Sequence, residues 1–171
     1  MKSARVMAVI GALLPVLAWA KTGIGRIEIE AGGSSARTIE SPDLARRFSI
    51  WNGPGTSSDR TNSQSLADWT PGIVEPPAGL TAARVTIFCG ARTATLEPCH
   101  VLKYAYDARR KRGYIYLPGP AEAGYQLNVR HVLRGVEGHW FRSTPEWDVL
   151  MAAPSWRSLS RSPPSRSTRA R

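Results

Sequence analysis

The chain has 171 residues, with 23 Lys and Arg against 13 Asp and Glu and a formal net charge of +10. This length is enough for one domain with a hydrophobic core and too short for two domains of ordinary size. The charge suggests a binder of nucleic acid or of an acidic surface. However, two basic residues precede position 21 and five follow position 153, which leaves 16 basic against 13 acidic residues between them. The body of the chain is therefore close to neutral, which weakens that interpretation.

Residues 1–20 have the pattern of a secretory signal peptide. Lys2 and Arg5 are followed by an uncharged apolar run, and Ala18-Trp19-Ala20 supplies the small residues that a signal peptidase reads. The uncharged stretch of 15 residues is shorter than the roughly 20 residues of a membrane-spanning helix, which disfavours a membrane anchor. We therefore expect cleavage after Ala20, a periplasmic or secreted protein, and no transmembrane segment in the mature chain.

Several short segments alternate between apolar and polar residues, as half-buried β-strands do. The predicted strands are Ile27–Glu30, Phe48–Trp51, Arg84–Cys89, Cys99–Tyr106, Tyr114–Leu117 and Tyr125–Leu133. A single helical turn is predicted at Asp43–Arg47. Together these segments predict an all-β fold, an antiparallel sandwich or small barrel of about six strands.

Two connections between the predicted strands have distinctive compositions. The segment from Asn52 to Leu80 is rich in Gly, Pro, Ser, Thr and Asn, and a connection of this length is usually functional or mobile. We expect Trp69 to pin this long loop to the core. The segment Asp107–Gly113 should join two strands as a hairpin, with Gly113 able to take a positive φ.

Cys89 and Cys99 are the only cysteines. In an oxidising compartment an isolated pair usually forms a disulfide, and both residues fall on faces assigned to the core. The adjacent His100 raises the alternative of a reactive thiol, but neighbouring residues on a strand point to opposite faces. The spacing also does not match the C-x-x-C redox motif. The sequence therefore predicts a structural disulfide between the ends of two consecutive strands.

The hairpin around residues 107–113 carries the candidate ligand face, which combines tyrosines expected to share one face with a basic turn. Its residues are Tyr104, Tyr106, Arg109, Arg110, Lys111, Arg112, Tyr114 and Tyr116. Aromatic rings beside cations suit stacking on sugars or bases, while the cations meet uronate or phosphate groups. A secreted location favours a glycan over nucleic acid. The alternative is that these tyrosines pack on one another or under a covering loop.

Three histidines leave little material for a catalytic or metal site. The residues nearest to a metal-ligand set are His131, Glu137 and His139, but a catalytic zinc site usually has three ligands at tighter spacing. Hydrolase motifs such as G-x-S-x-G, S-x-x-K and H-E-x-x-H are absent from the sequence. We expect no catalytic residue, no metal and no cofactor. A hydrolase that uses His100 or His139 under the 52–80 loop remains the alternative.

Residues 154–171 contain six Ser, five Arg and three Pro, and no acidic residue. This composition cannot bury enough apolar surface to offset the entropy of ordering, so we expect a disordered tail. One interpretation is electrostatic attachment to an anionic surface. The other is a solvated end without a role.

Three stretches resemble uncharacterised secreted proteins of proteobacteria: Ile50–Gly55, Gly113–Gly119 and Arg134–Phe141. The resemblance covers the body from Phe48 to Trp147. It carries no known activity, so it transfers no catalytic residue to this chain.

The expected organisation is a signal peptide at 1–20, a single β domain at 21–153 and the tail at 154–171. The expected function is that of an exported, non-enzymatic binding or interaction protein. Its expected partner is an envelope glycan or another envelope protein rather than nucleic acid. The alternatives are an envelope hydrolase and peripheral attachment to anionic surfaces through the basic tail.

Overall fold

The computed structural model describes residues 23–32, 35–56, 63–90 and 95–152. The predicted signal peptide at 1–20 and the predicted tail at 154–171 lie outside these residues. The strands are β1 (Gly23–Glu30), β2 (Arg37–Glu40), β3 (Phe48–Ser49), β4 (Gln64–Ser65), β5 (Ala67–Asp68), β6 (Ala82–Gly90), β7 (Glu97–Asp107), β8 (Arg112–Tyr116) and β9 (Trp140–Ser143). The helices are α1 (Leu44–Arg47), α2 (Tyr125–His131) and α3 (Pro145–Ala152).

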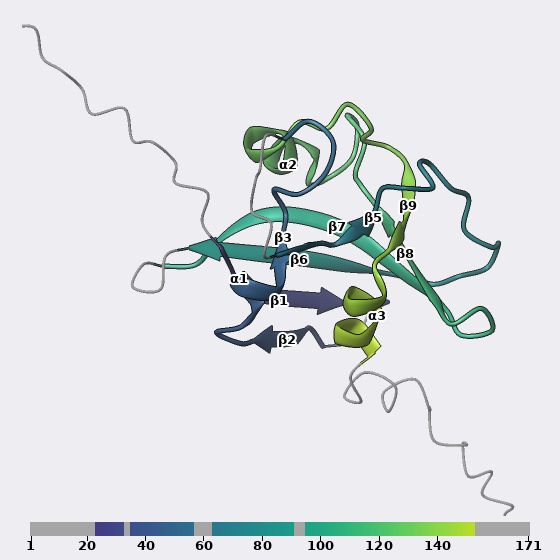
Figure 1. Cartoon of the computed structure of the whole chain (residues 1–171), viewed down its shortest axis with the longest axis horizontal. Coiled ribbons are helices and arrows are strands. Elements are labelled where there is room, and N and C mark those ends of the chain that lie inside the picture. The colour runs from purple at the N-terminus through teal and green to yellow at the C-terminus, as the bar shows by residue number, and fades with distance from the viewer. Residues whose placement is uncertain (1–22, 33–34, 57–62, 91–94, 153–171) are drawn as a thin grey trace, which may run out of the picture.

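Seven strands form one antiparallel sheet in the order β2-β1-β6-β7-β8-β9-β5, and β3 pairs in parallel with β4 (Figure 1). The predicted all-β antiparallel class is confirmed. Within the described residues β2 and β5 are the two free edges, so the sheet does not close and the small-barrel alternative is wrong. The helices and the short β3–β4 pair, rather than a second large sheet, supply the other layers.

Four predicted strands are present because their alternating side chains match the two faces of the sheet. The predictions at 27–30, 84–89, 99–106 and 114–117 overlap β1, β6, β7 and β8. The helical turn predicted at 43–47 is confirmed as α1, and the strand predicted at 48–51 is shortened to β3.

The hydrophobic core lies on one side of the sheet, which we call the core face. Cross-strand neighbours on this face include Val85 opposite Leu102 and Ile115 opposite Phe141, all of them buried. Helices α1 and α3, together with β3, cover the core face with the buried side chains of Leu44, Phe48, Trp147 and Met151. The Trp147 side chain is 0% exposed, and its ring meets that of Phe48 edge-on with centroids 5.3 Å apart.

The segment predicted as a strand at 125–133 is instead the helix α2, which packs on the opposite side of the sheet against β7. Its contact side consists of residues spaced by four: Gly124 before the helix, Asn128 within it and Val132 after it. A side chain at Gly124 would run into Val101, and Asn128 bonds to both backbone groups of Val101 at 2.7 Å. Because the contact side of α2 carries a glycine and an asparagine, the sequence shows no apolar residues at helical spacing. This explains why the segment is predicted as a strand.

Trp69 pins the long loop to the core, as predicted. Its ring lies 4.9 Å from that of Phe141, and its Nε1–H donates to Ser65 Oγ at 2.8 Å. The Arg134 guanidinium lies over the same ring, 4.9 Å from its centroid, and donates to the carbonyl oxygens of Ile50 and Pro54. The loop is therefore tied to the segment that follows α2. Among the described residues no helix has both the length and the apolar character needed to cross a membrane.

Candidate functional site

The disulfide predicted between Cys89 and Cys99 is confirmed. It joins the end of β6 to the start of β7, and both residues are buried. Because the chain has no other cysteine, no thiol is available for chemistry. The reactive-thiol alternative is excluded in this disulfide-bonded form.

The four tyrosines of the hairpin do not share a face, and the prediction that they would is wrong. Residues directly opposite each other in antiparallel strands share a face, and the register places Tyr106 opposite Gly113 and Tyr114 opposite Ala105. Tyr104 and Tyr106 therefore lie on the core face, and Tyr114 and Tyr116 lie on the face that α2 covers. The four residues between β7 and β8 set this pairing, which puts even positions of β7 opposite odd positions of β8.

Three of these tyrosines are held by contacts within the protein. Tyr104 is 5% exposed and Tyr114 is 6% exposed. The Tyr104 hydroxyl donates to Asp148 Oδ1 at 2.9 Å, and the Tyr116 hydroxyl donates to Glu122 Oε2 at 2.6 Å. Tyr106 is half-buried and is the one tyrosine that lines the pocket described below.

Glu122 is held as a fully ionised carboxylate on the α2 side of the sheet. It accepts hydrogen bonds from Lys103 Nζ at 2.8 Å, from Tyr116 and from the Gly119 N–H at 2.8 Å. These bonds, led by that of Lys103, lower the pKa of Glu122 to about 2. The hydrogen bond to Glu122, followed by burial, raises the pKa of Tyr116 to about 12. The cluster fixes the turn before α2, and neither Glu122 nor Tyr116 exchanges a proton near neutral pH.

The basic turn is organised by Asp107, which is buried at the end of β7. Burial raises the pKa of Asp107, but hydrogen bonds from the backbone and side chain of Arg110 and from the backbone of Arg109 outweigh it, and the net shift is downward. Arg110 is thereby neutralised within its own turn. The positive φ of the turn belongs to Lys111, at 49°, and not to Gly113 as predicted.

Gly113 lacks a side chain because the space is occupied by the carboxylate of Asp148. A methyl group there would collide with Asp148, with the Ser143 hydroxyl and with the ring of Tyr104. The Gly113 N–H donates to Asp148 Oδ2 at 2.9 Å, and the Ser143 hydroxyl donates to Asp148 Oδ1. With the bond from Tyr104, Asp148 joins α3 to β7, β8 and β9.

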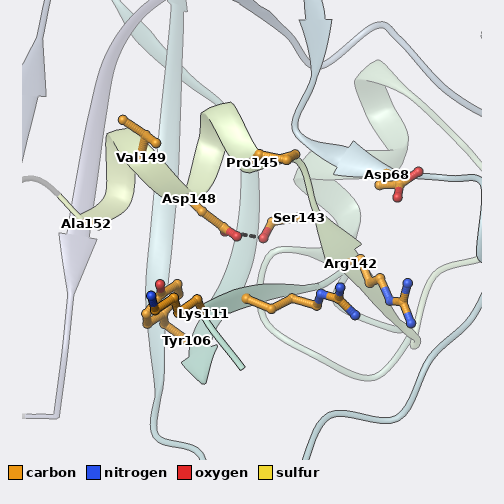
Figure 2. A pocket seen from close by; sticks show the side chains of 10 residues that line it. Asp68, Tyr106, Lys111, Arg142, Ser143, Pro145, Asp148, Val149 and Ala152 are labelled. Carbon is orange, nitrogen blue, oxygen red and sulfur yellow. Dashed lines mark hydrogen bonds between the residues drawn. The ribbon is translucent and has the colours of Figure 1, made fainter. Parts of the chain in front are cut away.

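A pocket of about 390 Å³ opens beside this junction, bounded by α3, the basic turn and the paired ends of β9 and β5 (Figure 2). Figure 2 shows Asp148 and Ser143 on one side of it and Arg142 and Asp68 on the other. Its lining residues are Asp68, Tyr106, Lys111, Arg112, Arg142, Ser143, Pro145, Asp148, Val149 and Ala152.

The pocket holds more available positive than negative charge. No carboxylate among the described residues lies within ion-pair distance of its three cations, Lys111, Arg112 and Arg142. Asp148 is engaged by three donors, whereas Asp68 accepts one bond, from the Thr70 N–H at 3.1 Å. The arrangement suits the binding of an anion that also carries hydrogen-bond donors. No histidine or cysteine lines the pocket.

Three of the eight residues of the predicted ligand face line this pocket: Tyr106, Lys111 and Arg112. The sequence prediction missed Asp68, Arg142 and Asp148. A signal existed for Asp148, because Thr144-Pro145-Glu146 is a typical helix start that would have revealed α3. Nothing local marks Asp68 or Arg142, which only strand pairing brings to the same place.

The histidines are kept apart. His100 is 2% exposed, and burial, followed by the charges of Arg134 and His131, lowers its pKa to about 3. It lies beneath the long loop in a cavity of about 10 Å³, and it makes no hydrogen bond to a Ser, Asp or Glu of the described chain. His139 is exposed on the surface. The geometry that the hydrolase alternative requires at His100 is therefore not present.

The residues nearest to a metal-ligand set are also dispersed. His131 ends α2 and stacks edge-on at 6.3 Å from Trp51, while Glu137 accepts a hydrogen bond from the Arg134 N–H at 2.6 Å. The described part of the chain contains no group of three His, Cys, Asp or Glu side chains arranged to hold a metal ion.

The site is thus a cationic pocket with an ordered inner wall and no catalytic pair in its lining. On one side of the pocket Asp148 is held by three hydrogen bonds. The cations of the pocket form no ion pair with a carboxylate of the described chain. Comparisons with protein-family models, with curated proteins and with solved structures found no match for this chain. Function is accordingly argued from the chemistry of the pocket.

Proposed function

We propose that the protein is an exported, non-enzymatic binding protein whose pocket takes an anionic glycan of the cell envelope. The observation that carries this proposal is the set of three cations, Lys111, Arg112 and Arg142, that line one pocket without an ion-pair partner in the described chain. Cations that a protein does not neutralise itself are available to a ligand. Tyr106 also lines this pocket, from the core face of the sheet.

The dimensions of the pocket support a small ligand or the end of a larger one. Small-molecule sites commonly span about 300–1,000 Å³, and this pocket of about 390 Å³ falls at the lower end of that range. Exposed cations bind anions in a salt-dependent way, since mobile ions screen them. We therefore expect affinity to fall as the salt concentration rises.

The disulfide supports export. A buried bridge such as Cys89–Cys99 persists in oxidising compartments and is rare in reducing ones. An exported location favours a glycan over nucleic acid as the anionic ligand.

Binding of a polyuronate by calorimetry at low salt tests the proposal. Arg142→Ala and Arg112→Ala should each weaken binding about tenfold or more, because each removes a charge-assisted contact worth about 1.5–3 kcal/mol. The matched control is Arg84→Ala, an exposed cation of β6 that does not line the pocket. Equal losses in all three variants, or no loss in the pocket variants, would refute the proposal.

A further inference from the structure

We infer that the pocket selects a uronic-acid unit, whose carboxylate meets the arginines and whose ring hydroxyls donate to Asp68. The inference rests on the proposed function and adds to it the chemical class of the ligand. It starts from an acidic side chain in an otherwise anion-attracting pocket. Asp68 is half-buried and is not ion-paired with any described residue.

The position of Asp68 is fixed by the sheet. It lies directly opposite Arg142 in the β5–β9 pair, so the two side chains leave the same face. The Thr70 N–H holds Asp68 Oδ1 at 3.1 Å, and no described group donates to Oδ2. One carboxylate oxygen of Asp68 is therefore available as a hydrogen-bond acceptor at the rim of a cationic pocket.

The two arginines are placed to share one carboxylate. Arg142 lies directly opposite Tyr114, and Arg112 is two residues before Tyr114 on the same face of β8. Diagonal neighbours of this kind are about 7–8 Å apart at the backbone, within reach of long side chains. A planar guanidinium matches a carboxylate in a bidentate fork, which a point charge such as Lys111 does not.

An acceptor carboxylate beside these arginines discriminates between anions. It repels a fully ionised sulfate, which brings no donor of its own. It stabilises a ligand that presents hydroxyl donors next to its negative charge, as a uronic acid does. Tyr106 lines the same pocket from the core face, whereas Arg112, Arg142 and Asp68 leave the opposite face of the sheet, so the selection of the ligand rests on the charged groups.

Calorimetry with three probes tests the inference: digalacturonate, maltose and inorganic sulfate. The wild-type protein should bind digalacturonate at least about tenfold more tightly than either of the other two. Asp68→Ala should lower the affinity for digalacturonate about tenfold and leave that for sulfate equal or higher. The matched control is Glu75→Ala, which removes an exposed carboxylate outside the pocket and should change neither affinity.

The outcomes separate this inference from the proposed function. If Arg142→Ala weakens binding of all anions while Asp68→Ala leaves the preference for digalacturonate unchanged, the uronate inference is wrong and the anion pocket stands. If Arg142→Ala and Arg112→Ala leave digalacturonate binding unchanged, both are wrong. Asp68→Asn, which keeps the side-chain shape, supplies the result if the alanine variant does not fold.

Discussion

Gly113 and Asp148 form the tightest junction at the residue scale. We predict that Gly113→Ala destabilises the protein by about 1–3 kcal/mol, because the added methyl group collides with Asp148 in a closely packed site. Urea unfolding measures this loss. In the double variant with Asp148→Ala the loss should be less than the sum of the single losses, because one change removes the group that the other displaces. Strictly additive losses would contradict the described junction.

His100 makes stability depend on pH. Its pKa is about 3 in the folded protein, against about 6.5 when unfolded, so only the unfolded chain takes up a proton as the pH falls through this window. The contribution of His100 to the stability is therefore fully present above about pH 6.5 and falls by up to about 1.4 kcal/mol per pH unit below it. The lowered pKa of Glu122, about 2, adds a loss in the same direction only below its usual value near 4.5.

The two contributions can be separated by comparing unfolding free energies at pH 6.5 and pH 4.5, where Glu122 contributes little. His100→Gln should show a smaller loss than the wild-type protein over this interval. A remainder is expected from His131, whose pKa is also lowered by burial and by Arg130. An unchanged loss in the His100→Gln variant would mean that His100 is not the buried neutral group described.

At the scale of elements, α2 depends on one side chain. The Asn128 amide bonds to the N–H and the carbonyl oxygen of Val101, both at 2.7 Å, in a buried position. Asn128→Ala should cost about 2–4 kcal/mol, because it leaves two buried backbone groups without partners. Chemical unfolding and hydrogen exchange at the Val101 amide report this loss. A cost below about 0.5 kcal/mol, or an amide that stays protected, would contradict it.

The predicted strands are recognised from the alternation of residue types along the sequence, although burial in the structure follows that alternation only in part. β1 and the first half of β6 alternate between buried and more exposed residues, whereas β7 and β8 are buried on both faces over most of their length, since α2 packs against β7 on the face opposite the core. α2 could not be recognised, because its contact side uses Gly124 and Asn128 in place of apolar residues. Hydrophobic periodicity carries no information about a helix held by close backbone approach and a polar pair.

The candidate site was predictable only in part for a similar reason. Lys111 and Arg112 stand in a conspicuous basic turn, and Tyr106 lies beside them. Asp68 and Arg142 come from distant parts of the chain and meet only through the β5–β9 pairing. The prediction of a common tyrosine face was wrong because it depends on the length of the turn between β7 and β8. A turn longer or shorter by one residue would have placed the tyrosines of the two strands on the same face.

For the whole molecule, the pocket and the basic tail make different predictions about anion binding. The tail at 154–171 carries five Arg residues, and none of them lines the pocket, because all the lining residues lie between Asp68 and Ala152. We predict that deleting residues 154–171 lowers non-specific retention on anionic resin and leaves digalacturonate affinity within about twofold of the full chain. Loss of digalacturonate binding on deletion would instead assign the binding to the tail.

The central claim is that the pocket beside α3 is the ligand site, and backbone amide chemical shifts during titration with digalacturonate test it most directly. The account predicts that the largest shifts cluster at Asp68, at the turn from Lys111 to Gly113 and at Arg142 and Ser143. It also predicts that Arg142→Ala moves these shifts to about tenfold or higher digalacturonate concentration while Arg84→Ala leaves them unchanged. Shifts confined to other surfaces, or unchanged by Arg142→Ala, would contradict the account.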